Sequence, residues 1–147
     1  MTRRQAREHL FIMLFRREFH MNDELPEQVD LYLESAKDLG EMDLEVYEEE
    51  LKSFRPKDIE ELKSKMNKIV EKLDEIDEII SSISTGWKIN RMGKVDLTVM
   101  RIAVYEIKYD ESIPDVVSVN EAVEIAKKFG EETSGSFVNG VLAKLLN

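Results

Sequence analysis

The sequence predicts an all-α protein of about seven helices, arranged as one domain over residues 1–147 that contains two small helical bundles. Apolar residues recur three and four positions apart through most of the chain, as they do on one face of a helix. The three prolines and six glycines lie mostly between these segments, where helices begin and end. We place the two helical subdomains at about 1–85 and 86–147.

The N-terminal part is predicted to contain three helices. Residues 3–20 include the run LFIMLF, which leaves no wholly polar face for a turn and a half, so we expect this helix to be central. An acidic helix over 24–39 is expected to end at Gly40. A shorter helix is expected over 43–54.

Residues 56–85 carry the clearest helical period. Pro56 suits the first turn of a helix, and Gly86 suits the position just past its end. Between them, eight apolar residues alternate three and four positions apart: Ile59, Leu62, Met66, Ile69, Leu73, Ile76, Ile80 and Ile83. The pattern predicts one continuous helix of roughly 40 Å within a bundle.

After Gly86, the secondary structure of residues 95–104 is ambiguous, whereas a helix is clearly indicated further along the chain. Residues 95–104 are rich in β-branched side chains and fit a strand or a helix equally well. Ser118 and Glu121 match a capping box, so a helix is expected to begin at Ser118 and to end at Gly130.

The C-terminal segment contains Asn139-Gly140, a strong hairpin signal. Its apolar residues nevertheless follow a helical stripe: Phe137, Val138, Val141, Leu142, Leu145 and Leu146. We therefore predict a helix in which Gly140 costs about 1 kcal/mol relative to alanine and lets another helix approach closely. Trp87, just after a helix-ending glycine, is expected to pack at the junction of two bundles.

Composition excludes several classes of protein. The chain has no cysteine, so disulfides and thiolate metal sites are impossible. Its longest apolar run has six residues, too few to span a bilayer, and no secretory cleavage pattern follows it. We expect a soluble cytoplasmic protein that has no contact with a membrane.

Charge is distributed unevenly along the chain. The formal net charge is −10, yet residues 1–20 carry five arginines against two glutamates. A short basic end on an acidic body fits a polyanion contact confined to one patch. On charge alone, the slightly better explanation is that the arginines keep an otherwise apolar first helix soluble.

Nothing in the sequence forms a recognisable catalytic site. His9 and His20 lie eleven residues apart, about 16 Å along a helix, and cannot share a metal ion. No Glu-x-x-His motif, phosphate-binding glycine loop or activated nucleophile is present. We expect neither catalysis nor a metal or cofactor.

The arginines at the front of the chain have a suitable geometry for binding phosphates. Arg3 and Arg7 are one helical turn apart, and Arg4 is 100° around the axis from Arg3. The N-terminus of the helix adds partial positive charge. Since guanidinium groups bind phosphates in bidentate fashion and stack on exposed bases, single-stranded RNA is a plausible ligand.

Three blocks of sequence resemble one bacterial family, the NusB transcription antitermination factors: RRQAREHLFIMLF, WKINRMGKVDLTVMRIAVYEI, and IPDVVSVNEAVEIAKKFG with SFVNGVL. The resemblance implies two perpendicular three-helix subdomains and a helix over 94–110. It also implies binding to boxA RNA of ribosomal RNA leader transcripts together with the ribosomal protein NusE. That pair joins the elongating RNA polymerase with NusA and NusG. A monomer and a homodimer are both compatible with it.

The resemblance also assigns candidate site residues. The arginine-rich motif of the family falls on Arg3, Arg4 and Arg7. Further RNA candidates follow from the loop between the last two helices: Lys127, Lys128 and Phe137. The surface that faces NusE includes positions that fall on Phe15 and Asp96. Many members have tyrosine where this chain has Phe15. The sequence lacks a basic segment before Asn147, from which we expect weaker RNA affinity.

Two other functions remain compatible with the sequence. The chain is also similar to the RNA-recognition module that precedes the catalytic domain of certain ribosomal RNA cytosine methyltransferases. It could equally be a protein-binding helical scaffold whose arginines only increase solubility.

Overall fold

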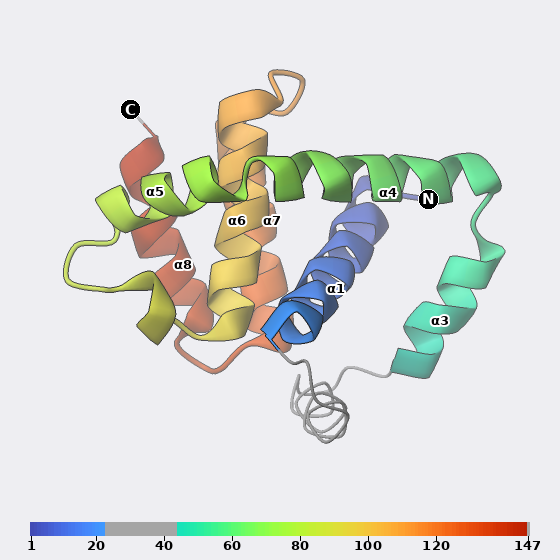
Figure 1. The fold of residues 1–147 in the computed structure, drawn as a ribbon, viewed down its shortest axis with the longest axis horizontal. Coiled ribbons are helices and arrows are strands. Elements are labelled where there is room, and N and C mark those ends of the chain that lie inside the picture. Colours follow the sequence, from blue (N-terminus) through green and yellow to red (C-terminus); the bar gives the residue numbers. More distant parts are fainter. Residues whose placement is uncertain (23–43, 147) are drawn as a thin grey trace. The chain divides into compact units, whose positions relative to one another are not determined.

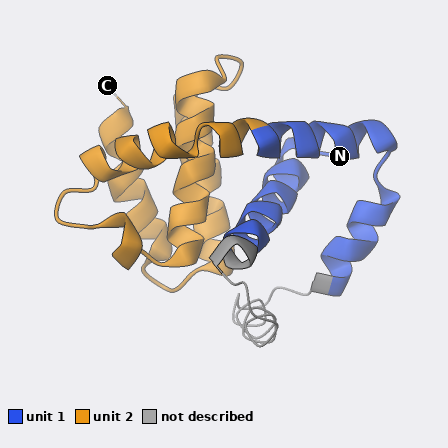
Figure 2. Ribbon diagram, viewed as in Figure 1, with its two compact units in different colours: residues 1–67 blue, residues 68–147 orange. Residues whose placement is uncertain are grey.

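The computed structural model describes residues 1–22 and 44–146, and Figure 1 shows their fold. The described part of the chain contains α-helices and two short 3₁₀ segments but no strand, which confirms the all-α prediction. The chain divides into two compact units, residues 1–67 and 68–147 (Figure 2). No helix among the described residues is long and apolar enough to cross a membrane.

The first unit contains α1 (Arg3–Asn22), α3 (Leu44–Ser53) and most of α4 (Pro56–Glu71). The predicted first and third helices are thus confirmed. The predicted helix over 24–39 lies outside the described residues. One stripe of α1 is buried, and its members are spaced as one helical face requires: Arg7, Leu10, Phe11 and Leu14.

The prediction of one continuous helix over 56–85 is wrong, because the helix is interrupted at Lys72. α4 ends at Glu71 and α5 (Leu73–Ile83) begins one residue after Lys72. The Lys72 amide donates to the Ile69 carbonyl at 3.0 Å, three residues back, so the backbone tightens by a single turn. Ile69 and Ile76 on either side are fully buried. The apolar period therefore continues across the break and hides it.

The second unit is built around α6 (Lys94–Tyr109), with α7 (Asp115–Phe129) and α8 (Ser134–Leu142) packed on it. Two short 3₁₀ segments, η1 (Ile89–Arg91) and η2 (Ala143–Leu145), complete it. Residues 97–100 and 102–106 of α6 are buried on several sides, which explains why their sequence lacks a polar face. The helix over 94–110 is confirmed.

The division between the two compact units falls after Asn67, so α5 lies in the second unit. The subdomain boundary at about residue 85 stays a prediction. α5 packs against α6 and α8, and Arg101 of α6 donates two hydrogen bonds of 2.8 Å to the carboxylate of Asp77 on α5. This bidentate pair connects α5 to the helix at the centre of the unit.

The capping box predicted at Ser118 is wrong. α7 begins three residues earlier, at Asp115 after Pro114, and Ser118 lies inside the helix at 2% exposure. Its hydroxyl donates to the buried carboxylate of Glu106 on α6 at 2.9 Å. A buried carboxylate needs hydrogen-bond donors, so Ser118 serves the core in place of the helix end. The end of α7 at Gly130 is confirmed.

The reason given for Gly140 is also wrong, although the helix around it is confirmed. Among the described residues, a Cβ at Gly140 would meet no atom within 4 Å apart from its chain neighbours and the backbone of its own helix. The close approach occurs at Gly135, where a Cβ would come within 2.9 Å of Lys127 Cγ on α7. Gly135 is buried, and α7 and α8 pack tightly around it.

The two glycines are expected to respond to alanine with opposite signs. Gly140→Ala should raise the free energy of unfolding by about 0.5–1 kcal/mol, because alanine is the better helix former at an open position. Gly135→Ala should lower it by about 1–3 kcal/mol, because the new methyl group overlaps the Lys127 stem. Urea denaturation of both variants measures the difference. Destabilisation by both would contradict the open position of Gly140.

Candidate nucleic-acid and partner-binding surfaces

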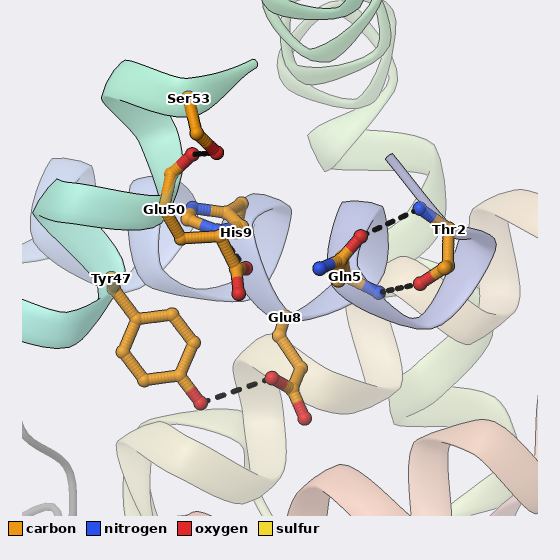
Figure 3. Close-up of polar contacts among 7 residues, drawn as sticks. All are labelled: Thr2, Gln5, Glu8, His9, Tyr47, Glu50 and Ser53. Carbon is orange, nitrogen blue, oxygen red and sulfur yellow. Dashed lines mark hydrogen bonds and ion pairs between the residues drawn. The ribbon is translucent and has the colours of Figure 1, made fainter.

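The N-terminus of α1 is fixed by a capping box that the sequence analysis missed (Figure 3). The Thr2 amide donates to Gln5 Oε1 at 2.7 Å, and the Gln5 amide donates to Thr2 Oγ1 at 3.0 Å. The pattern Thr-x-x-Gln ahead of an apolar run is the signal that identifies it. Two backbone donors of the first turn are thereby satisfied, which orders the turn that carries Arg3 and Arg4.

The sequence predicts one exposed surface for Arg3, Arg4 and Arg7, but only two of these arginines are exposed. Arg3 and Arg4 are exposed, whereas Arg7 is 6% exposed. Arg7 is buried because it lies on the stripe that continues through Leu10 and Phe11. An RNA contact by Arg7 stays a prediction, but only Arg3 and Arg4 present their guanidinium groups to solvent.

Removal of the cap is expected to loosen the first turn of α1. Thr2→Ala should lower the free energy of unfolding by about 1 kcal/mol, because the Gln5 amide loses its acceptor. Thr2→Ser keeps a hydroxyl and should stay near the parent protein. Hydrogen exchange at the first amides of α1 tests the local effect. Equal protection in both variants would show that the cap does not order the turn.

His9 of α1 is a packed residue that joins α1 to α3. It is 3% exposed, and its Nε2 lies 2.8 Å from Glu50 Oε1 (Figure 3). The rings of Tyr47 and Phe54 contact it edge to face at centroid distances of 5.4 and 5.0 Å. The Tyr47 hydroxyl also donates to Glu8 Oε2 at 3.0 Å. These contacts position α3 on α1.

No metal site accompanies this histidine. Within the described residues, no group of three or more histidine, aspartate or glutamate side chains is arranged to hold a metal ion. The polar atoms around His9 instead pair with one another across the two helices. Their arrangement is that of a helix–helix contact.

The three C-terminal RNA candidates lie on two helices: Lys127 and Lys128 on α7, and Phe137 on α8. Lys127 and Lys128 are exposed in the last turn of α7. The stem of Lys127 lies against Gly135 of α8. Phe137 is two positions further along α8, about 200° around its axis, and contacts Trp87 instead.

Trp87 is exposed, which corrects the prediction that it packs at a junction. Its exposed fraction is 54%, and its ring meets Phe137 edge to face at 5.4 Å. The sequence did contain a signal for this position: residues 79–95 carry Lys88, Arg91 and Lys94 but no acidic residue. Exposed aromatic side chains beside basic residues are a feature of surfaces that bind single-stranded nucleic acid.

Phe15, one of the two candidates for partner binding, is buried. It is 4% exposed, and its ring lies 5.7 Å from that of Phe11. The two residues are four positions apart and share the buried face of α1. The Phe15 ring is therefore packed inside the first unit, and its part in partner binding stays a prediction.

Asp96, the other candidate, lies in the first turn of α6 with one oxygen unpaired. Among the described residues, its buried Oδ1 has no hydrogen-bond partner. Burial raises the pKa of this carboxyl, and the charge of Glu131 raises it further, while a hydrogen bond with Ser134 acts in the opposite direction. A buried carboxylate oxygen without a hydrogen bond costs free energy, and a cation brought close to this carboxyl would lower that cost.

Comparison with known proteins gives consistent results over nearly the entire chain. The model of the NusB family matches residues 4–147. Two proteins named transcription antitermination protein NusB are similar to this chain. The one from Lachnoclostridium phytofermentans is 50% identical, and both chains are covered completely. The one from Agathobacter rectalis is 47% identical, and 98% of each chain is covered.

Solved structures are similar as well. The T. maritima NusB has a TM-score of 0.75 and 32% identity over 99% of this chain and 90% of that one. A second, described as "Crystal Structure of a Plectonemic RNA Supercoil", has a TM-score of 0.72 and 27% identity over 97% of this chain and 92% of that one.

Proposed function

This chain belongs to the NusB family of transcription antitermination proteins, and we propose that it acts as a non-enzymatic adaptor that binds boxA-type single-stranded RNA together with the ribosomal protein NusE. The pair would then join the elongating RNA polymerase with NusA and NusG. The relatives at 47–50% identity carry the name of antitermination proteins, which supports this role over that of a detached methyltransferase module.

One observation carries the RNA-binding proposal. Arg3 and Arg4 are exposed at the capped N-terminus of α1, in a chain whose net charge is −10. Solubility does not require basic residues in a protein with so many carboxylates. A helix N-terminus with two guanidinium groups provides backbone amides, a favourable dipole and bidentate donors for phosphate oxygens. Similarity to a solved structure described by its RNA is consistent with this ligand.

The partner proposal rests on Asp96. A charged oxygen that is buried without a hydrogen bond costs free energy in the isolated protein. The cost is removed if NusE supplies an arginine or lysine side chain at this position. Such a contact would also favour the ionised form of a carboxyl whose pKa is raised in the free chain.

A titration of a fluorescently labelled boxA-like RNA tests the proposed function. The protein is added with and without NusE, beside a scrambled RNA of equal length, and anisotropy is recorded. Tight binding that requires both the specific sequence and NusE is expected. Sedimentation of the same samples is measured because a homodimer that covers the arginines would compete with RNA. No RNA binding under any of these conditions would leave a protein-binding scaffold as the function.

A further inference from the structure

The only tryptophan of the chain stands beside a hollow in the second unit. The hollow has a volume of about 230 Å³ and lies between the end of α5 and one face of α8. Trp87 and Phe137 form an aromatic wall, and the remaining lining is small or polar: Ser84, Thr85, Ser136, Gly140, Val141 and Lys144. Since Gly140 has no side chain, nothing from α8 fills the space above it.

The two rings are arranged so that another ring can stack on the indole. Trp87 and Phe137 meet at an interplanar angle of 71°, edge to face. In such a contact, Phe137 leaves at least one face of the indole uncovered. Trp87 is 54% exposed, so about half of this side chain is accessible to solvent. A large exposed aromatic face costs free energy in water, and a planar ligand would cover it.

The polar side of the hollow suits the edge and the phosphate of a nucleotide. Lys144 Nζ donates to Thr85 Oγ1 at 3.2 Å, so an ammonium and a hydroxyl lie together there. Along the chain, Trp87 is followed by the exposed basic residues Lys88, Arg91 and Lys94. A flat apolar face with cations nearby is the arrangement with which proteins bind unpaired bases.

We propose that this hollow is a subsite for one unpaired base of single-stranded RNA, which stacks on Trp87 while Lys144 pairs with the neighbouring phosphate. The inference rests on the proposed RNA-binding function and deepens it. Arg3 and Arg4 bind phosphates and have no aromatic neighbour in their own turn of α1. The Trp87 subsite supplies the stacking contact that recognises RNA as single-stranded.

The experiment uses the intrinsic fluorescence of the full chain, because Trp87 is its sole tryptophan. A labelled pyrimidine-rich RNA is titrated, and quenching of Trp87 is compared with the anisotropy of the RNA. We expect both signals to have the same midpoint. Trp87→Ala should weaken binding by about 5- to 150-fold with an unchanged salt slope, since stacking releases no counterions. Lys144→Ala should instead reduce the salt slope by about 0.7.

Two further variants keep the test specific. Gly140→Leu retains Trp87 but places a side chain in the hollow, and it should weaken RNA binding as Trp87→Ala does, with helicity checked by circular dichroism. Tyr109→Ala removes another exposed aromatic ring, at the opposite end of α6 from Asp96, and should leave affinity unchanged.

The outcomes separate this inference from the proposed function. RNA binding that is lost in an Arg3→Ala/Arg4→Ala variant but is normal in both Trp87→Ala and Gly140→Leu would overturn the subsite and leave the adaptor function in place. Constant fluorescence through saturation would overturn it as well. A Trp87→Ala variant that loses NusE but not RNA would assign the hollow to a protein. No RNA binding by the parent chain, with or without NusE, would overturn both proposals.

Discussion

Replacement of Arg3 and Arg4 by alanine is expected to weaken RNA binding by roughly 10- to 30-fold near 0.1 M salt. Each phosphate contact to a single strand contributes about 0.7 to the slope of log affinity against log salt, so loss of two contacts should reduce the slope by about 1.4. Because both side chains are exposed, their removal leaves no cavity, and the fold should stay intact. Anisotropy titrations between about 0.05 and 0.3 M salt measure affinity and slope together.

The matched control removes the same amount of charge from the same unit. Lys57 and Lys63 are exposed on α4, so Lys57→Ala/Lys63→Ala has the same net charge as the arginine variant. If RNA responds only to overall charge, the two double variants will lose affinity equally. If the N-terminus of α1 is the phosphate site, only the arginine variant will show the reduced slope. An unchanged slope in the arginine variant would leave these residues a purely solubilising role.

The behaviour of α1 illustrates how far the sequence could predict this site. The helix itself follows from the run LFIMLF and is confirmed. The sequence did not predict which residues of α1 are exposed. Five of the six residues in this run are buried, and no polar face of the helix marks the side that meets solvent. Arg7 and Phe15 occupy positions of the buried stripe, and only the three-dimensional packing reveals it. A match to a family motif therefore identifies which residue occupies a position, but it does not show whether that residue is exposed.

Two further differences between the predicted and the observed helices have causes that the spacing of apolar residues does not reveal. Lys72 interrupts a stripe whose spacing is the same on both sides, because one tightened turn shifts the register by less than one position. Ser118 has the sequence of a helix cap, but the helix begins earlier, after Pro114, and the Ser118 hydroxyl donates to Glu106. The competing partner is twelve residues away in sequence, so local patterns could not identify it.

Reversal of charge at Asp96 is expected to have the largest effect on partner binding. Asp96→Lys should weaken the complex with NusE by about 30-fold or more, because a cation would then face the cation that we expect from the partner. Glu111→Lys is the matched control, since it makes the same change in net charge on the exposed loop beyond the other end of α6. Titration calorimetry compares the two. Equal affinity of both variants would remove Asp96 from the interface.

From the unpaired carboxylate of Asp96 we also expect that a substitution that removes its charge will raise the stability of the fold and weaken partner binding. The folded-state pKa of Asp96 is raised above its ordinary value of 3.8, so at pH values between the two the folded chain holds a proton that the unfolded chain has released. Stability of the parent protein therefore decreases as pH rises through this window. Asp96→Asn removes this dependence.

At neutral pH, Asp96→Asn should consequently unfold at a higher temperature than the parent, and its advantage should shrink as pH falls toward 4. The same variant should bind NusE more weakly, because the amide offers no charge to a partner cation. Melting temperatures of both proteins between pH 4 and 8 give the difference directly, and the other carboxylates cancel because both chains contain them. A difference that does not vary with pH would show that the ionised carboxylate is not strained. In that case the free energy available for binding at Asp96 would have to come from contacts outside this residue.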